Sequence, residues 1–269
     1  MIGNFVRNWI EMDKLVVFIF GSIVGSFLNV CIYRLPKGRS IVFPGSHCPN
    51  CGEKIHWFDN IPILSYIILL GKARCCKAKI SLRYFIVEAL TAIVFLTFFM
   101  AFGLSAKFFA YLIFSCGLIV ATFVDFEIQE IPDEVSIGGL IAGLTLSATF
   151  PSILNEMTRA GGLTSSFLGA LVGGAMIYGM GMLGELAFKK EAMGGGDVKL
   201  LAMIGSFLGW KLTVLTFFVA PLFGSVVGII VMIREGKKVI PYGPYLSLAA
   251  VFSIFFGDRL LRLLFYGLY

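Results

Sequence analysis

Charged residues are scarce in this sequence, and long hydrophilic stretches are nearly absent. Only 14% of the 269 residues are Asp, Glu, Lys or Arg, whereas 58% are hydrophobic. Soluble domains are roughly half apolar and about one quarter charged, so this composition excludes an ordinary soluble domain. The basic residues are spread along loops without interleaved aromatic side chains, which argues against nucleic-acid binding. A membrane protein with several spans is the expected class.

Apolar runs recur along the chain, and a membrane-spanning helix needs about 20 mostly apolar residues. The sequence predicts eight such segments, of which the fourth and sixth are short: 15–33, 85–104, 108–124, 135–150, 164–187, 198–210, 213–233 and 243–265. The first run is longer than the apolar core of a typical signal peptide and no small-residue cleavage site follows it, so we expect a retained helix. The predicted fold class is an all-α polytopic membrane protein with about eight transmembrane helices.

The hydrophilic segment 34–83 interrupts the apolar runs and is rich in proline, glycine, cysteine and charge. Because positively charged flanks resist translocation, we expect this segment and the basic connections 189–190 and 234–238 on the cytoplasmic side. The predicted division is a first transmembrane helix (1–33), a cytoplasmic cysteine-containing loop subdomain (34–83) and a transmembrane domain (84–269).

Ionisable side chains at membrane depth are costly and mark functional sites by default. Asp125 follows an apolar run, and Asp197 opens another one. With eight spans, both carboxylates lie at similar depth on the cytoplasmic face. Such a pair is the minimum apparatus for aspartyl proteolysis, because one carboxylate takes a proton from water while the other, protonated, polarises the scissile carbonyl.

Three glycines directly precede Asp197: Gly194, Gly195 and Gly196. Without side chains, this backbone can lie against an extended substrate strand. A structural interpretation stays open as well, since Asp is a favoured helix N-cap and Asp125 could mark where a helix enters water. Glu88 is expected to pair with Arg83 or Arg34. A proton-coupled or metal transporter is the rival from another class, although it leaves the glycines unexplained.

Four cysteines in segment 34–83 form a candidate metal site. Cys48 and Cys51 form a CxxC, and the adjacent Cys75 and Cys76 follow after a gap. On the reducing cytoplasmic side a disulfide is not expected, which leaves metal binding or free thiols. Neighbouring residues usually point apart, so three alternatives stay open. Cys75 completes a distorted zinc site, one of the two histidines of the sequence does so, or no tight zinc is bound.

Six stretches resemble, in order and spacing, the type IV prepilin peptidases, a branch of the GxGD intramembrane aspartyl proteases. They are FGSIVGSFLNVCIYRLP (20–36), CPNCGEKIHWFDNIPILSYIILLGK (48–72), ISLRYFIVE (80–88), VDFEIQEIPDEV (124–135), GGGD (194–197) and IPYGPYL (240–246). The likeness covers nearly the whole chain. It implies that Asp125 and Asp197 are the catalytic pair and that 84–269 is the peptidase domain.

The same resemblance implies a multi-pass enzyme of the bacterial inner membrane. It would remove the short basic leader from prepilins or pseudopilins at the cytoplasmic face and N-methylate the new terminus with S-adenosylmethionine. The expected partners are these substrates and the lipid bilayer, and the oligomeric state stays open. A presenilin-like protease is disfavoured, because Val124 precedes the first aspartate where that group has Tyr.

The expected cofactors are S-adenosylmethionine and Zn²⁺. A nearer alternative is a peptidase without methyltransferase activity, like the archaeal preflagellin enzymes. The long cysteine-bearing loop argues against it, and Ala73, where the family pattern would have a cysteine, argues mildly for it. No strand precedes a GxGxxG turn, so the methyl-donor pocket cannot be located from a motif. Glu53 and Lys54 are the candidates for contact with the methyl donor.

Overall fold

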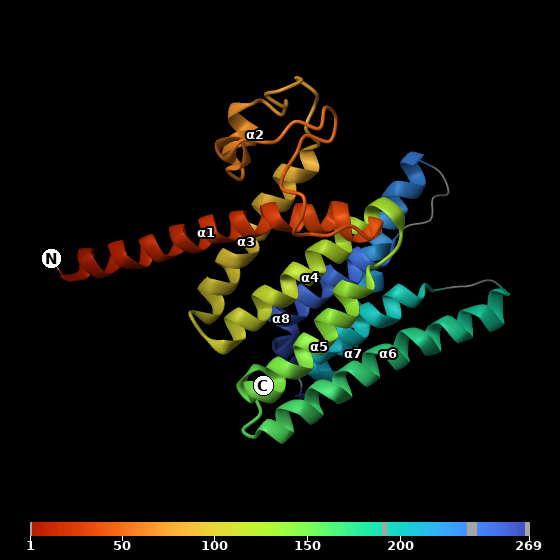
Figure 1. Cartoon of the computed structure of the whole chain (residues 1–269). Helices are drawn as coiled ribbons and strands as arrows, with labels where there is room; N and C mark the ends of the chain where they lie inside the picture. The colour runs from red at the N-terminus through yellow and green to blue at the C-terminus, as the bar shows by residue number, and fades with distance from the viewer. Residues whose placement is uncertain (1, 190–192, 236–240, 267–269) are drawn as a thin grey trace. The chain divides into compact units, whose positions relative to one another are not determined.

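The computed structural model describes residues 2–189, 193–235 and 241–266 (Figure 1). Regular structure in these residues is helical, and extended segments pair only at two isolated bridges, His47 with Lys54 and Lys72 with Lys79. The chain forms two compact units, Met1–Phe108 and Phe109–Tyr269. The predicted all-helical class is confirmed.

Two long helices, α1 (Ile2–Arg34) and α3 (Leu82–Phe102), pack together in the first unit. Glycine permits their close approach, since a Cβ atom at Gly21 would lie 2.8 Å from the Cα atom of Ala92. Small residues at such contacts let helix backbones approach in lipid. Between these helices the chain forms three short elements: η1 (Leu35–Lys37), η2 (Trp57–Asn60) and α2 (Leu64–Ile68). Figure 1 shows this connecting segment gathered near the N-terminal end of α3.

The second unit is a helix bundle in which α7 contacts α5, α6 and α8. Its elements are α4 (Ala106–Ile128), α5 (Asp133–Thr149), η3 (Pro151–Leu154), α6 (Arg159–Phe188), α7 (Gly195–Glu235) and α8 (Gly243–Tyr266). On α6, Gly169 lies directly against the backbone of Gly205 on α7. Phe114 of α4 packs on Phe207 of α7 with ring centroids 4.8 Å apart. These contacts bring the first part of α7 close to both helices.

A break at Gly209 divides α7 into two helical halves. Gly209 has φ 71° and ψ 166°, which are not helical angles. A Cβ atom on Gly173 would contact both Leu201 and Thr213, which lie on either side of the break. In one straight helix these two residues would stand about 18 Å apart along the axis. The chain therefore folds back at Gly209, and the two halves correspond to the predicted segments 198–210 and 213–233.

Five stretches of the described residues are long and apolar enough to cross a membrane: Met12–Lys37, Leu82–Phe102, Ala106–Ile128, Arg159–Ala187 and Gly195–Ile230. The predicted count of eight spans is not confirmed. The difference of three arises because Gly195–Ile230 covers both predicted segments of α7, and because α5 and α8 are not among the five. The 17 residues of α5 extend only about 25 Å. Hydropathy in the sequence did not separate these helices from full spans. Lys190 and residues 236–238, which belong to two of the predicted basic connections, lie outside the described residues.

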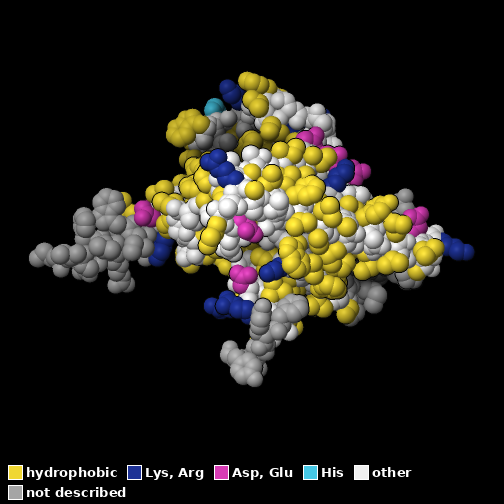
Figure 2. All heavy atoms as spheres, turned by 90° about the horizontal axis from the view of Figure 1, so that it is seen from below, with side chains coloured by type: hydrophobic (Ala, Val, Ile, Leu, Met, Phe, Trp, Pro, Cys, Tyr) yellow, Lys and Arg dark blue, Asp and Glu magenta, His cyan; other side chains and the backbone are white. Residues whose placement is uncertain are grey.

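Large apolar side chains are exposed along the spanning helices. Figure 2 shows hydrophobic side chains over much of the visible face, with charged side chains scattered among them. Examples from four different helices are Ile93, Phe109, Leu171 and Phe218. Soluble monomers rarely expose contiguous apolar surface of this extent, whereas lipid accepts it without cost. The chain is an integral membrane protein.

Candidate active site

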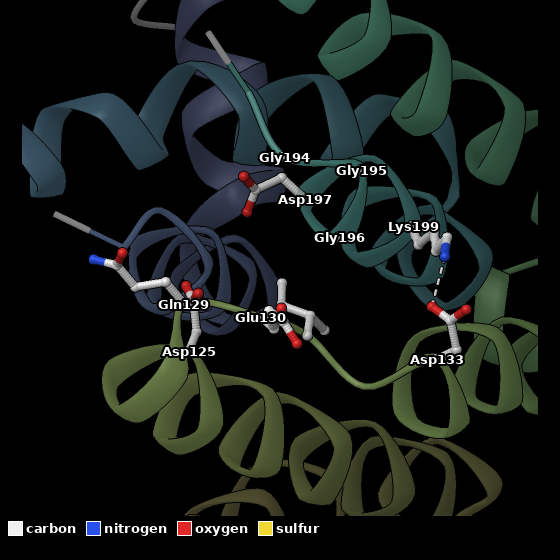
Figure 3. Close-up of a pocket in the computed structure, with 10 residues that line it drawn as sticks. Asp125, Gln129, Glu130, Asp133, Gly194, Gly195, Gly196, Asp197 and Lys199 are labelled. Carbon is white, nitrogen blue, oxygen red and sulfur yellow. Dashed lines mark hydrogen bonds and ion pairs between the residues drawn. The ribbon is translucent and has the colours of Figure 1, made fainter. Parts of the chain in front are cut away.

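One cavity of about 280 Å³ receives both predicted aspartates. Asp125 lies in the last turn of α4, and Asp197 lies in the first turn of α7. Figure 3 shows their carboxylates on opposite walls of this cavity. Asp125 is 5% exposed. Two carboxylates that line one small cavity disfavour the state in which both are ionised, so such a pair favours holding one proton between them.

The end of α4 positions the side of the cavity that carries Asp125. Gln129 ends the helix, because its φ of 56° is not helical. Its backbone N–H makes the last helical hydrogen bond, to the Asp125 carbonyl at 3.0 Å. Pro132 then precedes α5, so the connection between the two helices is short. Glu130 and Ile131 of this connection line the cavity beside the two aspartates.

Gly243, the first residue of α8, orients the Asp125 carboxylate. Its backbone N–H donates to Asp125 Oδ2 at 2.9 Å in a buried hydrogen bond. A Cβ atom on Gly243 would lie 2.7 Å from the same oxygen, so a larger residue would displace the carboxylate. Sequence reasoning noted IPYGPYL only as a resemblance and gave Gly243 no role. The glycine standing just before Pro244 at the start of an apolar run was the signal available for it.

The three glycines before Asp197 differ in what surrounds them. A Cβ atom on Gly196 would lie 3.3 Å from the Ile131 side chain, so this glycine permits close packing. Gly195 has nothing within 4 Å of its Cβ position, and Gly194 has only Asp197 and Gly196. Because both residues line the cavity, the space beside them is open rather than filled by protein.

Among the described residues that line the cavity, the charged side chains are mostly negative. The carboxylates belong to Asp125, Glu130, Asp133 and Asp197, and the cation is Lys199. The Lys199 ammonium lies 2.6 Å from Asp133 Oδ1, in an ion pair between exposed groups. Exposed pairs of this kind contribute at most about 1 kcal/mol to stability.

Four cysteine sulfurs converge in the first unit. The Sγ atoms of Cys48, Cys51, Cys75 and Cys76 all lie within 4.8 Å of one another. The distance is 3.7 Å between Cys48 and Cys76 and 3.3 Å between Cys51 and Cys75. A tetrahedral ion with metal–sulfur bonds of about 2.3 Å places its sulfurs about 3.8 Å apart. The four residues therefore fit one metal ion.

Neither histidine joins this group. His47 has its ring nitrogen 3.0 Å from the Gly45 carbonyl, and His56 stacks on Phe58. Of the three alternatives that the sequence left open, the structure has the arrangement in which Cys75 lies with the other cysteines.

Two tight turns present the cysteines. The first turn closes when Cys48 and Glu53 form a backbone hydrogen bond of 2.8 Å. The second closes when the Ala73 N–H donates to Ala78 at 2.8 Å. The backbone N–H of Ala78 and the amide of Asn50 lower the pKa of Cys76 to about 6, whereas the hydrogen bond with Cys51 raises the pKa of Cys75 to about 12. The thiolate is the form that binds metal.

The remaining predicted residues of segment 34–83 have other surroundings. Glu53 and Lys54 are exposed in the first cysteine turn, and their role with a methyl donor stays a prediction. Glu88 is buried and accepts a hydrogen bond from the Ile63 backbone at 2.7 Å. The Arg34 guanidinium donates instead to the backbone carbonyls of Ser40 and Pro44, so the structure does not have the expected pairing of Glu88 with Arg34. The alternative pairing with Arg83 stays a prediction.

Comparisons with known proteins agree with this architecture. Residues 19–102 match the Bacterial Peptidase A24 N-terminal domain, and residues 112–229 match the Type IV leader peptidase family. The "Prepilin leader peptidase/N-methyltransferase" of Pseudomonas aeruginosa is 34% identical and aligns with 92% of each chain. The protein of that name in Aeromonas hydrophila is 32% identical, also over 92% of each chain.

A third relative carries a different name. The "Type 4 prepilin-like proteins leader peptide-processing enzyme" of Escherichia coli is 36% identical over 87% of this chain and 91% of its own length. No solved structure matches the chain. A helical membrane protein with two carboxylates on one cavity is the class that the fold and the site define. The chain belongs to the Type IV leader peptidase family, a family of proteases.

We predict that Gly243→Ala lowers peptidase activity at least about tenfold, because the added methyl group displaces the Asp125 carboxylate and breaks its hydrogen bond. The matched control is Gly138→Ala on α5, whose Cβ position has nothing within 4 Å. Cleavage rate and thermal unfolding are measured for both variants in detergent. Equal activity of Gly243→Ala and wild type would show that this contact does not orient the carboxylate.

Proposed function

We propose that this protein is a bifunctional enzyme that removes the leader peptide from type IV prepilins or pseudopilins and then N-methylates the new N-terminal residue. The observation that carries the peptidase activity is the placement of Asp125 and Asp197 on one cavity. The names of the curated relatives support the substrate class and the second activity.

Asp125 and Asp197 are the catalytic residues of the proposal, and they act as a pair that holds one proton. The ionised carboxylate takes a proton from water while the protonated one donates a hydrogen bond to the scissile carbonyl oxygen. The water oxygen bonds to the carbonyl carbon and forms a tetrahedral intermediate. When this collapses, the carbon–nitrogen bond breaks and a proton from the pair passes to the leaving amine. The products are a free carboxyl group on the leader and a free amine on the mature protein.

Gly194 and Gly195 are proposed to contact the substrate main chain. Peptide bonds inside a helix are shielded, so the substrate must present its scissile bond in an extended form. A strand can approach this backbone, because the Cβ position of Gly195 faces open space and that of Gly194 has only Asp197 and Gly196 within 4 Å. The carboxylates of Glu130 and Asp133 on the same cavity suit the basic leader that the family resemblance implies.

The proposed location is the bacterial inner membrane, with the cavity at its cytoplasmic face and eight passes. In that arrangement the two halves of α7 count as separate passes, and segment 34–83 lies in the cytoplasm. The excess of Lys and Arg in that segment supports this orientation. The division into 1–33, 34–83 and 84–269 is part of the same proposal.

S-adenosylmethionine is the proposed donor, and it supplies an electrophilic methyl group when bound. The exposed side chains of Glu53 and Lys54 do not form an enclosed cradle by themselves, so we derive no step through this cofactor. Zn²⁺ is the proposed ion for Cys48, Cys51, Cys75 and Cys76, since four thiolates suit a tetrahedral structural site. All four sulfurs converge although residue 73 is alanine. This weakens the argument from Ala73 against a methyltransferase activity.

The direct test is intact-mass analysis of a prepilin co-expressed with wild-type enzyme, Asp125→Asn or Asp197→Asn. We expect wild type to yield a pilin that has lost its leader and gained one methyl group. Each Asn variant should leave the precursor whole, because neither amide can take part in the proton transfer. Glu134→Gln is the matched control, since this carboxylate lies in the first turn of α5 but does not line the cavity.

Each other outcome refutes part of the proposal. An intact precursor with correctly inserted wild-type enzyme would refute the peptidase activity. Cleavage by either Asn variant would refute the role of that aspartate. Leader loss without the methyl group would refute the second activity alone.

The metal proposal predicts about one zinc ion per chain in protein purified without chelator. Cys75→Ser should lower the zinc content as strongly as Cys76→Ser, since all four sulfurs converge. Cys116→Ser, in α4, should keep the ion. Zinc content is measured by elemental analysis of protein in detergent. Full zinc in Cys75→Ser together with loss in Cys76→Ser would exclude Cys75 from the site.

A further inference from the structure

The short helix α2 has two different faces. Tyr66 points toward α3, where its ring centroid lies 5.4 Å from that of Phe85. Leu64, Ile67 and Ile68 follow the i, i+3, i+4 spacing and share the opposite face. All three are exposed, and Ile68 is 72% exposed. A five-residue helix therefore turns an apolar stripe away from the protein.

Two neighbours extend this stripe. Leu70, two residues beyond α2, is 84% exposed. Trp57 is 78% exposed and belongs to η2, which contacts α2. We call these five side chains the α2 surface: Trp57, Leu64, Ile67, Ile68 and Leu70. Exposed apolar surface of this density, on a segment this small, marks contact with another phase or partner.

The contacts of α2 with α3 set its depth relative to the bilayer. The 21 residues of α3 extend about 31 Å, which is only slightly more than the hydrocarbon thickness of about 30 Å. Leu82 at its start is therefore close to one boundary of the hydrocarbon. Phe85 is one turn further in, and Glu88 is about 9 Å further in.

The residue just before α2 contacts α3 at the level of Glu88. The backbone N–H of Ile63 donates to Glu88 Oε2 at 2.7 Å. This hydrogen bond satisfies the buried Glu88 carboxylate and the half-buried Ile63 donor together. Since Glu88 lies inside the boundary, α2 begins at the depth where headgroups meet acyl chains rather than in water.

We propose that α2 and Trp57 form an interfacial membrane anchor, with the α2 surface immersed in the lipid headgroup–acyl boundary. Trp side chains favour this zone, and amphipathic segments enter it by about 5–10 Å. Between Leu35 and Ser81 the chain carries seven Lys or Arg residues against two carboxylates, which suits anionic headgroups. Segment 34–83 is thus held at the bilayer by α2 as well as by α1 and α3.

The test uses the full-length protein in proteoliposomes with Trp57 as its only tryptophan, made by Trp9→Phe and Trp210→Phe. Lipids carry bromine at either a shallow or a deep acyl position, and iodide is the aqueous quencher. We expect shallow bromines to quench Trp57 more than deep bromines, with little quenching by iodide. A variant with Trp210 alone is the positive control, because this half-exposed side chain lies on a membrane-spanning stretch.

Strong iodide quenching of Trp57 without bromolipid quenching would overturn the proposal. Loss of that iodide quenching on addition of a prepilin would instead assign the α2 surface to substrate docking. Ile68→Asp provides a second measurement on the same surface. It should shift Trp57 emission to longer wavelength and reduce the shallow quenching, while zinc content stays unchanged.

Discussion

Close backbone approach around Ile131 holds the two carboxylates at one cavity. Gly196 and Gly243 both lie against this side chain, with Cβ positions 3.3 Å from its atoms. The first turn of α7 and the first turn of α8 therefore converge on the connection after α4. Asp125 and Asp197 belong to segments more than seventy residues apart, and larger residues at either glycine would separate them. The proposed chemistry depends on this convergence.

Local sequence features were sufficient to place each aspartate. The end of one apolar run predicted Asp125 at a helix C-terminus, and the start of another predicted Asp197 at a helix start, as the structure has them. The hydrogen bond from Gly243 could not be predicted in this way, because its partners are 118 residues apart. Periodicity and capping describe neighbours along the chain, whereas this contact arises from bundle packing.

Two expectations show where such local rules have limits. Adjacent side chains point apart in an extended chain, so the sequence did not settle whether Cys75 is a metal ligand. Cys75 and Cys76 lie instead in a tight turn that closes between Ala73 and Ala78. In a turn the backbone direction changes at each residue, so neighbouring side chains can reach one centre. Hydropathy likewise separated two segments at Gly209 but could not tell how many helices are long and apolar enough to span a membrane.

Proton sharing between Asp125 and Asp197 is the central claim, and the pH dependence of kcat/KM tests it most directly. Activity needs one ionised and one protonated carboxylate, so it should fall at low pH, where both are protonated, and at high pH, where both are ionised. The account predicts a bell-shaped profile whose two apparent pKa values belong to the pair. A profile that rises with pH and stays level, measured with the enzyme stably folded throughout, would contradict it.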